Sequence, residues 1–374
     1  MRVIITGANG FIGTNFCEYL SAKGIEVIKY DIDDNFSLIQ SNISQCDAVF
    51  HIAGVNRTNN AQDFIMVNYG LTKKIIDLMI SCKINIPFIF SSSTAAVDDS
   101  LYGKSKKMAE DYINNFSISH AVPCAIFRFP NIYGRYCVPN YNSVVATFCH
   151  NIANNLPLAI DGDGKQTIEL AYIDDICHSV FKIMKSMIAN PREYVNGQIT
   201  YMKSTDTIDI NSLARMISSF PSAINSDFFL GGSSSCERKL FITFLSYLNY
   251  EKLFTLGIHH HNEKGDFVEF IKNDEFGQVS FLTVLPGQKR GGHFHLVTYE
   301  KFIVVSGQCT ISIKDMNSGV SKEFFLNEGD SLSVLPRTTH TISNCSDKTV
   351  VLMNYVSSVN DEKNSDTYYC IGGN

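Results

Sequence analysis

The chain has 374 residues, of which 45% are hydrophobic and 18% are charged, and its formal net charge is −6. Because a single hydrophobic core stops growing at roughly 250 to 300 residues, we expect two folded domains, and the composition excludes a disordered chain. The negative charge, without any run of five or more basic residues, excludes the basic surface that binds nucleic-acid phosphates. A small-molecule partner is expected instead.

The cysteines and the hydrophobic segments indicate a cytoplasmic protein. Eleven cysteines are scattered along the chain without a CxxC pair, and their odd number does not suit a disulfide framework. The first apolar segment, residues 2–6, leaves no room for a signal peptide. No apolar run reaches the ~18 residues of a membrane span, so we expect none.

Strand-like and helix-like segments alternate through the first two thirds of the chain. Short apolar runs predict strands, and segments with a helical apolar period predict helices. In chain order these are a strand at 2–6, a helix at 11–22, strands at 25–30 and 47–52, a helix at 67–82, a strand at 86–91, a helix at 104–118 and a strand at 122–128. The alternation predicts a Rossmann-type α/β domain over residues 1–245, with a doubly wound parallel sheet and a ligand site at the C-terminal ends of its strands.

A glycine-rich turn, ITGANGFIG, joins the first predicted strand to the first predicted helix. Gly7 can turn the chain sharply, and Gly10 and Gly13 allow the backbone to approach a pyrophosphate at the helix N-terminus, which Phe11 and Ile12 begin. The spacing is GxxGxxG rather than GxGxxG. On this motif alone, a purely structural glycine-rich turn stays an alternative.

The second predicted strand leads into Asp31, which bears on the choice of cofactor. A carboxylate at this position accepts hydrogen bonds from a ribose 2′-hydroxyl and repels a 2′-phosphate, which favours NADH over NADPH. The nearby Lys29 weakly favours the opposite choice, but a solvated lysine is the simpler interpretation.

A serine, a tyrosine and a lysine follow the fourth predicted strand in the order that carbonyl reduction needs. Tyr102 and Lys106 are one helical turn apart and so lie on one face. We expect the ammonium to lower the pKa of the tyrosine, which then acts as an acid catalyst, while the hydroxyl of Ser93 holds the substrate carbonyl. A lone YxxxK pair would more simply be a surface feature, but the order of the three residues favours catalysis.

Together these motifs resemble those of the extended short-chain dehydrogenase/reductases that act on sugar nucleotides. The resemblance covers the predicted α/β domain and rests on ITGANGFIG, FHIAG, VNYGLT, FSSST, YGKSK, RFPNIYG and AYIDDI. It implies that Ser93, Tyr102 and Lys106 are the catalytic triad and that Tyr102 and Lys106 also contact the cofactor. It further implies that Ala53 and Gly54 line the cofactor channel.

The same resemblance places Asn131 near the sugar or diphosphate of the substrate, where Ser93 also binds. Two departures from the family pattern affect this region. The triad serine and tyrosine are only nine positions apart, and Ile168 stands where many relatives have an arginine. Arg135 or Lys165 would then replace that arginine as the diphosphate ligand.

Beyond residue 248 the pattern changes to short alternating strands separated by Gly, Asn, Asp and Pro turns, without a further helix of convincing length. This predicts an all-β barrel over residues 250–374, with the domain boundary between residues 241 and 264. The sequence LSYLNYEKLF at this boundary is either a closing helix or a connector.

Histidine and glutamate side chains in the barrel have the spacing of a metal site. His293 and His295 alternate on a strand and so share one face, and Glu300 and His340 complete a set of three nitrogens and one oxygen. The set suits Zn²⁺ best, and iron, manganese or nickel less selectively. Such a metal is either catalytic or structural.

The positions from Gly287 to Asn344 match the consensus motifs of the cupin jelly-roll barrel, which this segment resembles. The run His259–His261 is more typical of a linker, because at most two of three consecutive histidines in a strand can converge. Only His260 is kept as a further metal-ligand candidate.

Over its whole length the chain resembles the CapF type of capsular polysaccharide assembling protein, in which a reductase domain precedes a metal-binding cupin. The segments RFPNIYGRYCVPNYNSVVATFCHNIA and YEKFIVVSG carry this resemblance most specifically. It implies that the cupin epimerises C3 of a UDP-linked 2-acetamido-2,6-dideoxy-4-hexulose. The reductase would then reduce C4 with NADPH to a UDP-acetamido-dideoxy-talose, on the way to N-acetyl-L-fucosamine. Both parent folds commonly dimerise, so we expect a homodimer.

Two alternatives stay open. In the first, the barrel is a ketoisomerase that makes a 3-keto intermediate from a different 4-keto sugar. In the second, both domains bind nucleotides without turnover, as a sensing assembly protein. The second predicts a broken triad, whereas the triad is intact.

Overall fold

The structure, a computed structural model, describes residues 1–196, 198–201, 206–225, 234–253, 258–273, 276–359 and 365–369. The chain divides into two compact units. One consists of Met1–Ser218 and Lys239–Leu248, and the other of Ser219–Arg238 and Asn249–Asn374. Within the predicted boundary region, residues 254–257 lie outside the described residues.

The first unit is built around a six-stranded sheet of order β2-β1-β3-β4-β5-β8, in which every neighbouring pair is parallel. The strands are β1 (Arg2–Thr6), β2 (Glu26–Tyr30), β3 (Ala48–His51), β4 (Phe88–Ser93), β5 (Cys124–Phe129) and β8 (Gln198–Tyr201). The predicted parallel sheet is confirmed. All residues of β3 and β5 are buried, which explains why these strands are apolar without alternation.

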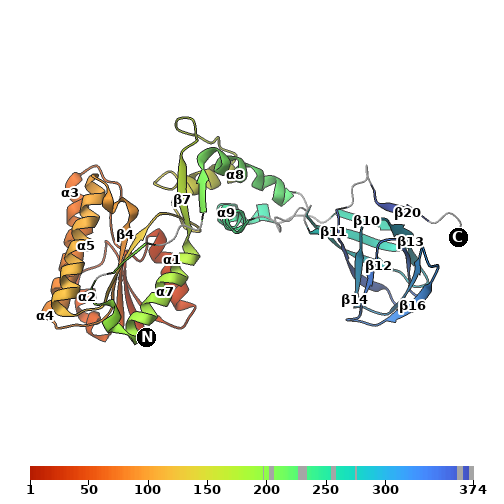
Figure 1. Cartoon of the computed structure of the whole chain (residues 1–374), viewed down its shortest axis with the longest axis horizontal. Coiled ribbons are helices and arrows are strands. Elements are labelled where there is room, and N and C mark those ends of the chain that lie inside the picture. The colour runs from red at the N-terminus through yellow and green to blue at the C-terminus, as the bar shows by residue number, and fades with distance from the viewer. Residues whose placement is uncertain are drawn as a thin grey trace. The chain divides into compact units, whose positions relative to one another are not determined.

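Helices cover both faces of this sheet. The described helices are α1 (Phe11–Ser21), α2 (Ser37–Asn42), α3 (Ala61–Asp63), α4 (Thr72–Ser81), α5 (Leu101–His120), α6 (Val144–Ala153), α7 (Ile173–Ala189), α8 (Ile210–Asn225) and α9 (Ser235–Leu245). Helices α4 and α5 pack together on one face, and α1 and α7 on the other (Figure 1).

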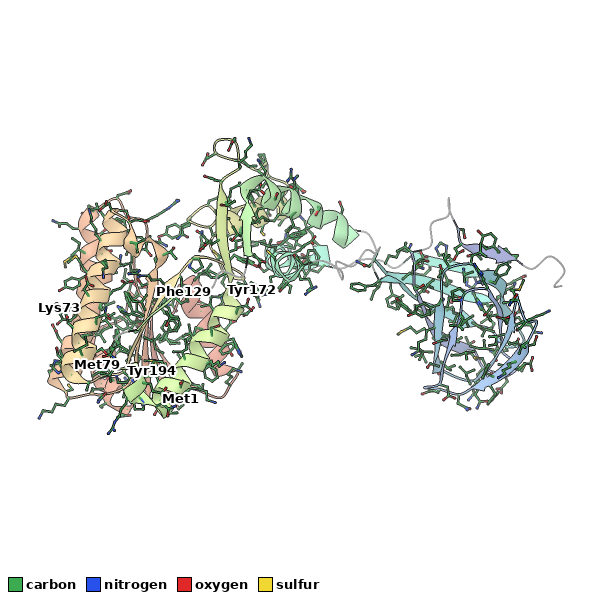
Figure 2. The ribbon with its side chains drawn as sticks, viewed as in Figure 1. Met1, Lys73, Met79, Phe129, Tyr172 and Tyr194 are labelled. Atoms are coloured by element: carbon green, nitrogen blue, oxygen red, sulfur yellow. The ribbon has the colours of Figure 1, made fainter. Side chains whose placement is uncertain are left out.

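A small sheet of β6 (Asn131–Tyr133), β7 (Thr167–Tyr172) and β9 (Asp206–Asp209) follows the end of β5. Figure 2 shows Phe129, the last residue of β5, at the opposite end of the parallel sheet from Met1, which precedes β1. The strand C-termini, and the loops that follow them, therefore lie at the Phe129 end.

Two elements differ from the prediction in ways that matter for the site. The helix predicted at 67–82 starts earlier, because a π-helix, η2 (Phe64–Leu71), runs directly into α4. Such turns are rare and are frequently found at functional sites. The strand predicted at 86–91 extends to Ser93, which places this serine at the C-terminal end of β4.

The second unit contains an antiparallel barrel of two sheets, which confirms the predicted all-β fold. Their strand orders are β10-β11-β12-β19-β14-β17 and β16-β15-β18-β13-β20. The strands are β10 (Ile258–Asn262), β11 (Gly265–Asn273), β12 (Gly277–Val284), β13 (Lys289–His295), β14 (Glu300–Ser306), β15 (Cys309–Asp315), β16 (Ser321–Leu326), β17 (Ser331–Val334), β18 (Thr338–Ser343), β19 (Val350–Val356) and β20 (Thr367–Tyr369). In the described part of LSYLNYEKLF, the end of α9 is followed by a short 3₁₀ turn, η5 (Tyr250–Leu253), so this segment is a connector.

The interior of the barrel is apolar towards one end and polar towards the other. Alternate residues of β12, β14 and β19 are buried, as expected for strands that line a core. The apolar side chains form a core cluster that includes Leu282, Val304 and Leu352. The buried polar side chains include Gln278, Ser280, Glu300 and Asn354.

Candidate active site and metal centre

The glycine-rich loop after β1 packs directly against the loop after β3. Gly7 has a φ of +67°, and a Cβ on it would lie 2.8 Å from the backbone nitrogen of Ala53. Glycine alone satisfies both the backbone angle and the close approach. Since the strand order reverses between β1 and β3, this is the crevice in which open α/β sheets bind nucleotides.

The first turn of α1 is suited to an anion. Gly10 is its N-cap and offers no side-chain hydrogen bond, so no cap side chain occupies the N–H groups of Phe11, Ile12 and Gly13. Together with the positive end of the helix dipole, these groups suit a pyrophosphate, as predicted from the sequence.

Asp31 ties the end of β2 to the same loop. Its Oδ2 accepts a hydrogen bond from the backbone nitrogen of Asn9 at 2.6 Å, and its Oδ1 accepts one from that of Ile32 at 2.8 Å. Lys29 is exposed on β2. The structure thus places a carboxylate beside the glycine-rich loop and the lysine in solvent.

Helix α5 carries Tyr102 in its first turn, which packs closely on the chain that follows β4. Ser100 caps the helix, its Oγ accepting a hydrogen bond from the nitrogen of Gly103 at 3.0 Å. A Cβ on Gly103 would lie 2.9 Å from the carbonyl oxygen of Asp98, so glycine permits this approach. As a result, the phenol of Tyr102 lies close to the side chain of Ser93.

The pKa of Tyr102 differs from the expectation. Burial raises this pKa above its ordinary value, and the hydrogen bond with Ser93 acts in the opposite direction. The predicted lowering by Lys106 is wrong for this structure, because the lysine ammonium donates instead to the carbonyl oxygen of Ser91, at 2.9 Å. A protonated phenol is the form that can donate a proton.

Lys106 is enclosed, with 4% of its surface exposed. Burial lowers its pKa to about 8, although the charge of Glu110 raises it. The ammonium lies 4.9 Å from the centroid of the Phe90 ring. A Cβ on Gly54 would lie 3.1 Å from the lysine Nζ, so the predicted cofactor-channel glycine borders the lysine.

Asn68 holds the loop after β3 against α5. Its Oδ1 accepts from the nitrogen of Val55 at 2.8 Å, and its Nδ2 donates to the Val55 oxygen and to Ser105 Oγ, each at 2.9 Å. The residue lies in the π-helix η2. Asn68 belongs to the motif VNYGLT, but the sequence alone gives it no role. An apolar helical period does not distinguish a π-turn from an α-turn, so it does not show where this side chain points.

A buried ion pair lies behind the triad. Glu110 on α5 accepts from Arg128 Nε at 2.8 Å and from Arg128 Nη2 at 2.6 Å, and also from Ser92 Oγ at 2.6 Å. Neither charged side chain is more than 5% exposed. Glu110 thus links the helix that carries Lys106 to β5 through Arg128, and to β4, which ends in Ser93, through Ser92. The sequence offered one signal of this pair: Glu110 and Arg128 have opposite charges, and one lies in a predicted helix and the other in a predicted apolar strand.

Asn131 and Arg135 lie beyond the end of β5, on the side where the strand C-termini lie. Asn131 begins β6 and donates from Nδ2 to the oxygen of Glu169 at 3.2 Å. Arg135 is exposed, and its guanidinium carbon lies 4.7 Å from the centroid of the Tyr136 ring. The other candidate cation, Lys165, is also exposed.

The predicted metal ligands come from both sheets of the barrel and converge. His293 and His295 lie on β13 and His340 on β18, whereas Glu300 begins β14 of the facing sheet. Glu300 Oε2 is 3.1 Å from His340 Nε2 and 3.3 Å from His295 Nε2. Ligand atoms of His293, His295 and Glu300 lie within 4.8 Å of one another, and the rings of His293 and His340 are centred 4.6 Å apart.

Burial sets the protonation of these groups. It lowers the pKa of His293 to about 4 and also lowers the pKa of His340. Burial opposes protonation of His295 as well, but the Glu300 carboxylate raises the pKa of this ring above its ordinary value. Two of the three imidazoles are therefore neutral at neutral pH, as metal ligands must be.

These residues fit a divalent metal ion. Nε2 of His295 and Oε2 of Glu300 are buried and have no hydrogen-bond partner, although they point into one small space. Nitrogen and carboxylate donors in this ratio suit zinc. A zinc ion would be held by His293, His295, Glu300 and His340.

Two residues that sequence analysis missed orient these ligands. His295 Nδ1 donates to the carbonyl oxygen of Asp366 at 2.9 Å, which leaves its Nε2 free for a metal. Glu300 Oε1 accepts from Asn354 Nδ2 at 3.0 Å. Such outer partners fix ligand geometry. They lie 71 and 54 positions away from the residues they hold, so no local pattern reveals them.

Strand β20 forms part of the wall of this site. It pairs with β13 so that Tyr369 lies opposite His293. The carboxylate of Asp366, just before β20, accepts hydrogen bonds from the backbone nitrogens of residues 296–298 at 3.0 to 3.1 Å. The metal ligands, Asp366, Tyr369 and Asn354 line one cavity of about 490 Å³.

The other conspicuous residues of the barrel lie elsewhere. His259, His260 and His261 are exposed on β10 and do not line the cavity, so His260 is not brought to the metal site. Asn344, the last residue of the second barrel motif, closes a turn by donating to the oxygens of Val284 and Lys348 at 2.8 and 2.7 Å. Its role is structural.

Two families match the chain. The NAD dependent epimerase/dehydratase family matches residues 3–197, and the Polysaccharide biosynthesis C-terminal domain matches residues 260–368. Among the helices that the structure describes, none is long and apolar enough to cross a bilayer.

Three relatives illustrate the range of similarity. The chain is 34% identical to the UDP-2-acetamido-2,6-beta-L-arabino-hexul-4-ose reductase of Pseudomonas aeruginosa, over 100% of this chain and 99% of that protein. It is 26% identical to the capsular polysaccharide assembling protein CapF of Staphylococcus aureus, with a TM-score of 0.84 and 99% of each chain covered. A UDP-glucose 4-epimerase of Thermotoga maritima shares the fold over 66% of this chain and 98% of its own, with a TM-score of 0.56 and 18% identity. The chain belongs to the NAD dependent epimerase/dehydratase family and, over its whole length, to the CapF type within it.

Proposed function

We propose that the protein is a bifunctional nucleotide-sugar enzyme of capsular polysaccharide or O-antigen precursor synthesis. Its barrel epimerises C3 of a UDP-2-acetamido-2,6-dideoxy-4-hexulose, and its α/β unit reduces the C4 ketone with NAD(P)H. The product is a UDP-2-acetamido-2,6-dideoxy-talose of the N-acetyl-L-fucosamine route. Whole-length similarity to a UDP-2-acetamido-2,6-beta-L-arabino-hexul-4-ose reductase supports a 4-keto UDP-sugar as substrate.

One observation carries the reductase assignment: Ser93, Tyr102 and Lys106 meet beside the nucleotide crevice. The reduced nicotinamide supplies the hydride when it is bound. The protonated phenol of Tyr102 gives its proton to the developing alkoxide at C4, and Ser93, whose side chain lies close to that phenol, orients the ketone oxygen. Lys106 lies one helical turn from the tyrosine and borders Gly54, where its ammonium would hold the ribose of the cofactor.

The epimerase assignment uses the chemistry of the same ketone. A C4 carbonyl acidifies the hydrogen on C3, so that a base can remove it and return it to the opposite face through an enolate. A divalent metal supplies a positive charge that stabilises an enolate oxygen. His293, His295, Glu300 and His340, which line one cavity, would hold this metal, which we infer to be zinc.

The deciding experiment separates the two reactions by withholding the cofactor. The protein is incubated with the 4-keto UDP-sugar in deuterated water, first without and then with NADH or NADPH, and the products are followed by NMR. We expect deuterium at C3 and the 3-epimer without cofactor, then the C4 alcohol with it. A 3-keto product would identify a ketoisomerase. If the protein showed no deuterium exchange and no cofactor oxidation, enzymatic turnover would be rejected. The matched control is His261→Ala, which replaces an exposed histidine that does not line the cavity.

A further inference from the structure

The geometry points to a hydroxyl-binding subsite in the barrel cavity at Asn354, which Ser280 backs from the neighbouring strand. This subsite recognises the hydroxyl next to the ketone of an α-hydroxyketone sugar. The inference rests on the proposed function of the barrel and specifies which feature of the substrate the cavity recognises.

Asn354 is fixed in one orientation. Its Nδ2 donates to Glu300 Oε1 at 3.0 Å, and because a carboxylate can only accept, the amide cannot be flipped. Its Oδ1 is consequently an acceptor, and it is buried without a hydrogen-bond partner. The residue is 5% exposed and lines the cavity. An acceptor in this position destabilises the fold unless a ligand or water donates to it.

Ser280 lies behind Asn354 and does not line the cavity. β12 and β19 pair so that Ser280 lies directly opposite Asn354. Residues paired in this way point to the same face, with their Cβ atoms about 4.5 to 5.5 Å apart. The serine is 0% exposed, and its Oγ also has no hydrogen-bond partner. A ligand hydroxyl in the cavity therefore meets Asn354, whose Oδ1 can accept its hydrogen.

The neighbours of this pair make the subsite specific. On the other side of Asn354, β14 places Phe302, which offers no polar atom. The next inward residue of β12, Gln278, already donates to Glu269 at 2.7 Å. Of these three neighbouring positions, Asn354 is therefore the one that lines the cavity with an acceptor left for a hydroxyl.

The position of the subsite defines the ligand class. Asn354 contacts Glu300, so a hydroxyl bound to Asn354 lies beside the predicted metal ligands. When a ligand hydroxyl binds at this point, a ketone on the neighbouring carbon can direct its oxygen towards the histidines. A ligand with these two neighbouring groups is an α-hydroxyketone. The C3 hydroxyl and C4 ketone of the proposed substrate have this arrangement.

The test is a thermodynamic cycle between ligand and protein. Zinc is replaced by Co²⁺, whose visible absorption reports ligands that enter the barrel and not those in the α/β unit. The protein is titrated with the 4-keto UDP-sugar and with its 3-deoxy analogue, without NAD(P)H. We expect the wild type to bind the hydroxylated ligand about 3- to 10-fold more tightly, as one net hydrogen bond predicts. Asn354→Ala is expected to bind both ligands equally.

A second variant tests whether contact with the cavity is what matters. Ser280→Ala leaves the bond between Asn354 and Glu300 in place, and because Ser280 does not line the cavity, this variant is expected to keep the preference for the hydroxylated ligand. Ser333→Ala, on the exposed side of β17, is the matched control and should keep the full preference. Metal content of every variant is measured, so that loss of the ion is not mistaken for loss of the subsite.

Three results would overturn the inference. If Asn354→Ala weakens both ligands by the same factor, the asparagine acts only through Glu300. If the wild type does not distinguish the two ligands, water fills the subsite. If neither ligand alters the cobalt spectrum while the α/β unit still oxidises NAD(P)H, the barrel does not bind the sugar, and the proposed epimerase function fails with the subsite.

Discussion

Lys106 donates a hydrogen bond to the carbonyl oxygen of Ser91 at 2.9 Å, two residues before Ser93 on the same strand. The ammonium is buried, and in the described part of the chain no carboxylate forms an ion pair with it, although the charge of Glu110 raises its pKa. Keeping this ammonium charged while it is buried lowers the free energy of unfolding.

Replacing Lys106 with methionine should stabilise the protein at neutral pH and abolish reduction. Burial lowers the lysine pKa from 10.5 to about 8, so the folded state binds this proton less tightly than the unfolded state. The penalty is fully present below pH 8 and fades as the pH rises towards 10.5, so stability increases with pH across this window. We expect Lys106→Met to raise the free energy of unfolding by about 1 to 3 kcal/mol at pH 7, and by less at pH 10.

Urea unfolding at both pH values measures this effect. The control is Lys107→Met, which removes an exposed lysine from the next position of the same helix and should change little. A lower stability of Lys106→Met at pH 7 would mean that the hydrogen bond to Ser91 outweighs the cost of burial.

Tyr102→Phe should slow ketone reduction by about 10²- to 10⁴-fold, the usual contribution of a positioned acid. The change removes only the hydroxyl that meets Ser93, so cofactor affinity should stay close to that of the wild type. Stopped-flow oxidation of NAD(P)H and fluorescence titration of the cofactor measure the two quantities. Tyr112→Phe, on the same helix but bonded to Asp77 at the surface, is the control. Unchanged cofactor oxidation in Tyr102→Phe would remove this residue from the mechanism.

Asp31→Ser should shift the preference from NADH towards NADPH. The carboxylate beside the glycine-rich loop repels a 2′-phosphate, and a serine removes the charge while retaining a polar side chain. The ratio of kcat/KM for the two cofactors is the measurement, and it should move by about tenfold or more, since one charge contact of this kind contributes on the order of 1 to 2 kcal/mol. Asp33→Ser, two positions on and exposed, should leave the ratio unchanged. A wild type that prefers NADPH would contradict the role given to Asp31.

Glu300→Gln should weaken zinc binding by more than about 100-fold, because even the loss of an outer partner costs 10- to 100-fold. Competition with a chromogenic chelator measures the affinity, and the melting temperature of the barrel should fall when the metal is removed. Wild-type zinc affinity in this variant would exclude Glu300 as a ligand. The control His261→Ala alters an exposed histidine that pairs with Asp266.

Asp366→Ala should weaken zinc binding by about 10- to 100-fold without removing a ligand. The carboxylate fixes residues 296–298, which follow His295, and its backbone carbonyl orients that ring. Asp366→Asn keeps one acceptor oxygen and should have an intermediate effect, whereas Asp347→Ala at an exposed turn should have none. Equal affinity in all three variants would show that β13 holds His295 without help from the C-terminal segment.

Much of the fold could be predicted from local patterns. Apolar runs without alternation mark β3 and β5 because helices cover both faces of their sheet, and alternation marks β12 and β19 because one face lines the barrel. The π-helix before α4 could not be predicted, because an apolar period does not distinguish π from α geometry over two turns. The protonation of Tyr102 was also predicted incorrectly, since spacing along a helix places two side chains on one face but does not fix where the ammonium points.

The sequence by itself determined which residues are proposed to carry the chemistry: the glycines after β1, the serine, tyrosine and lysine, and the histidines and glutamate of the barrel. These have short-range spacing, set by the periods of helices and strands. Only the tertiary structure decided which groups hold them in place, namely Asn68, the pair of Glu110 and Arg128, Asn354, and Asp366. Each of these joins elements far apart in the chain, and such contacts depend on how strands and helices pack rather than on any local pattern of residues.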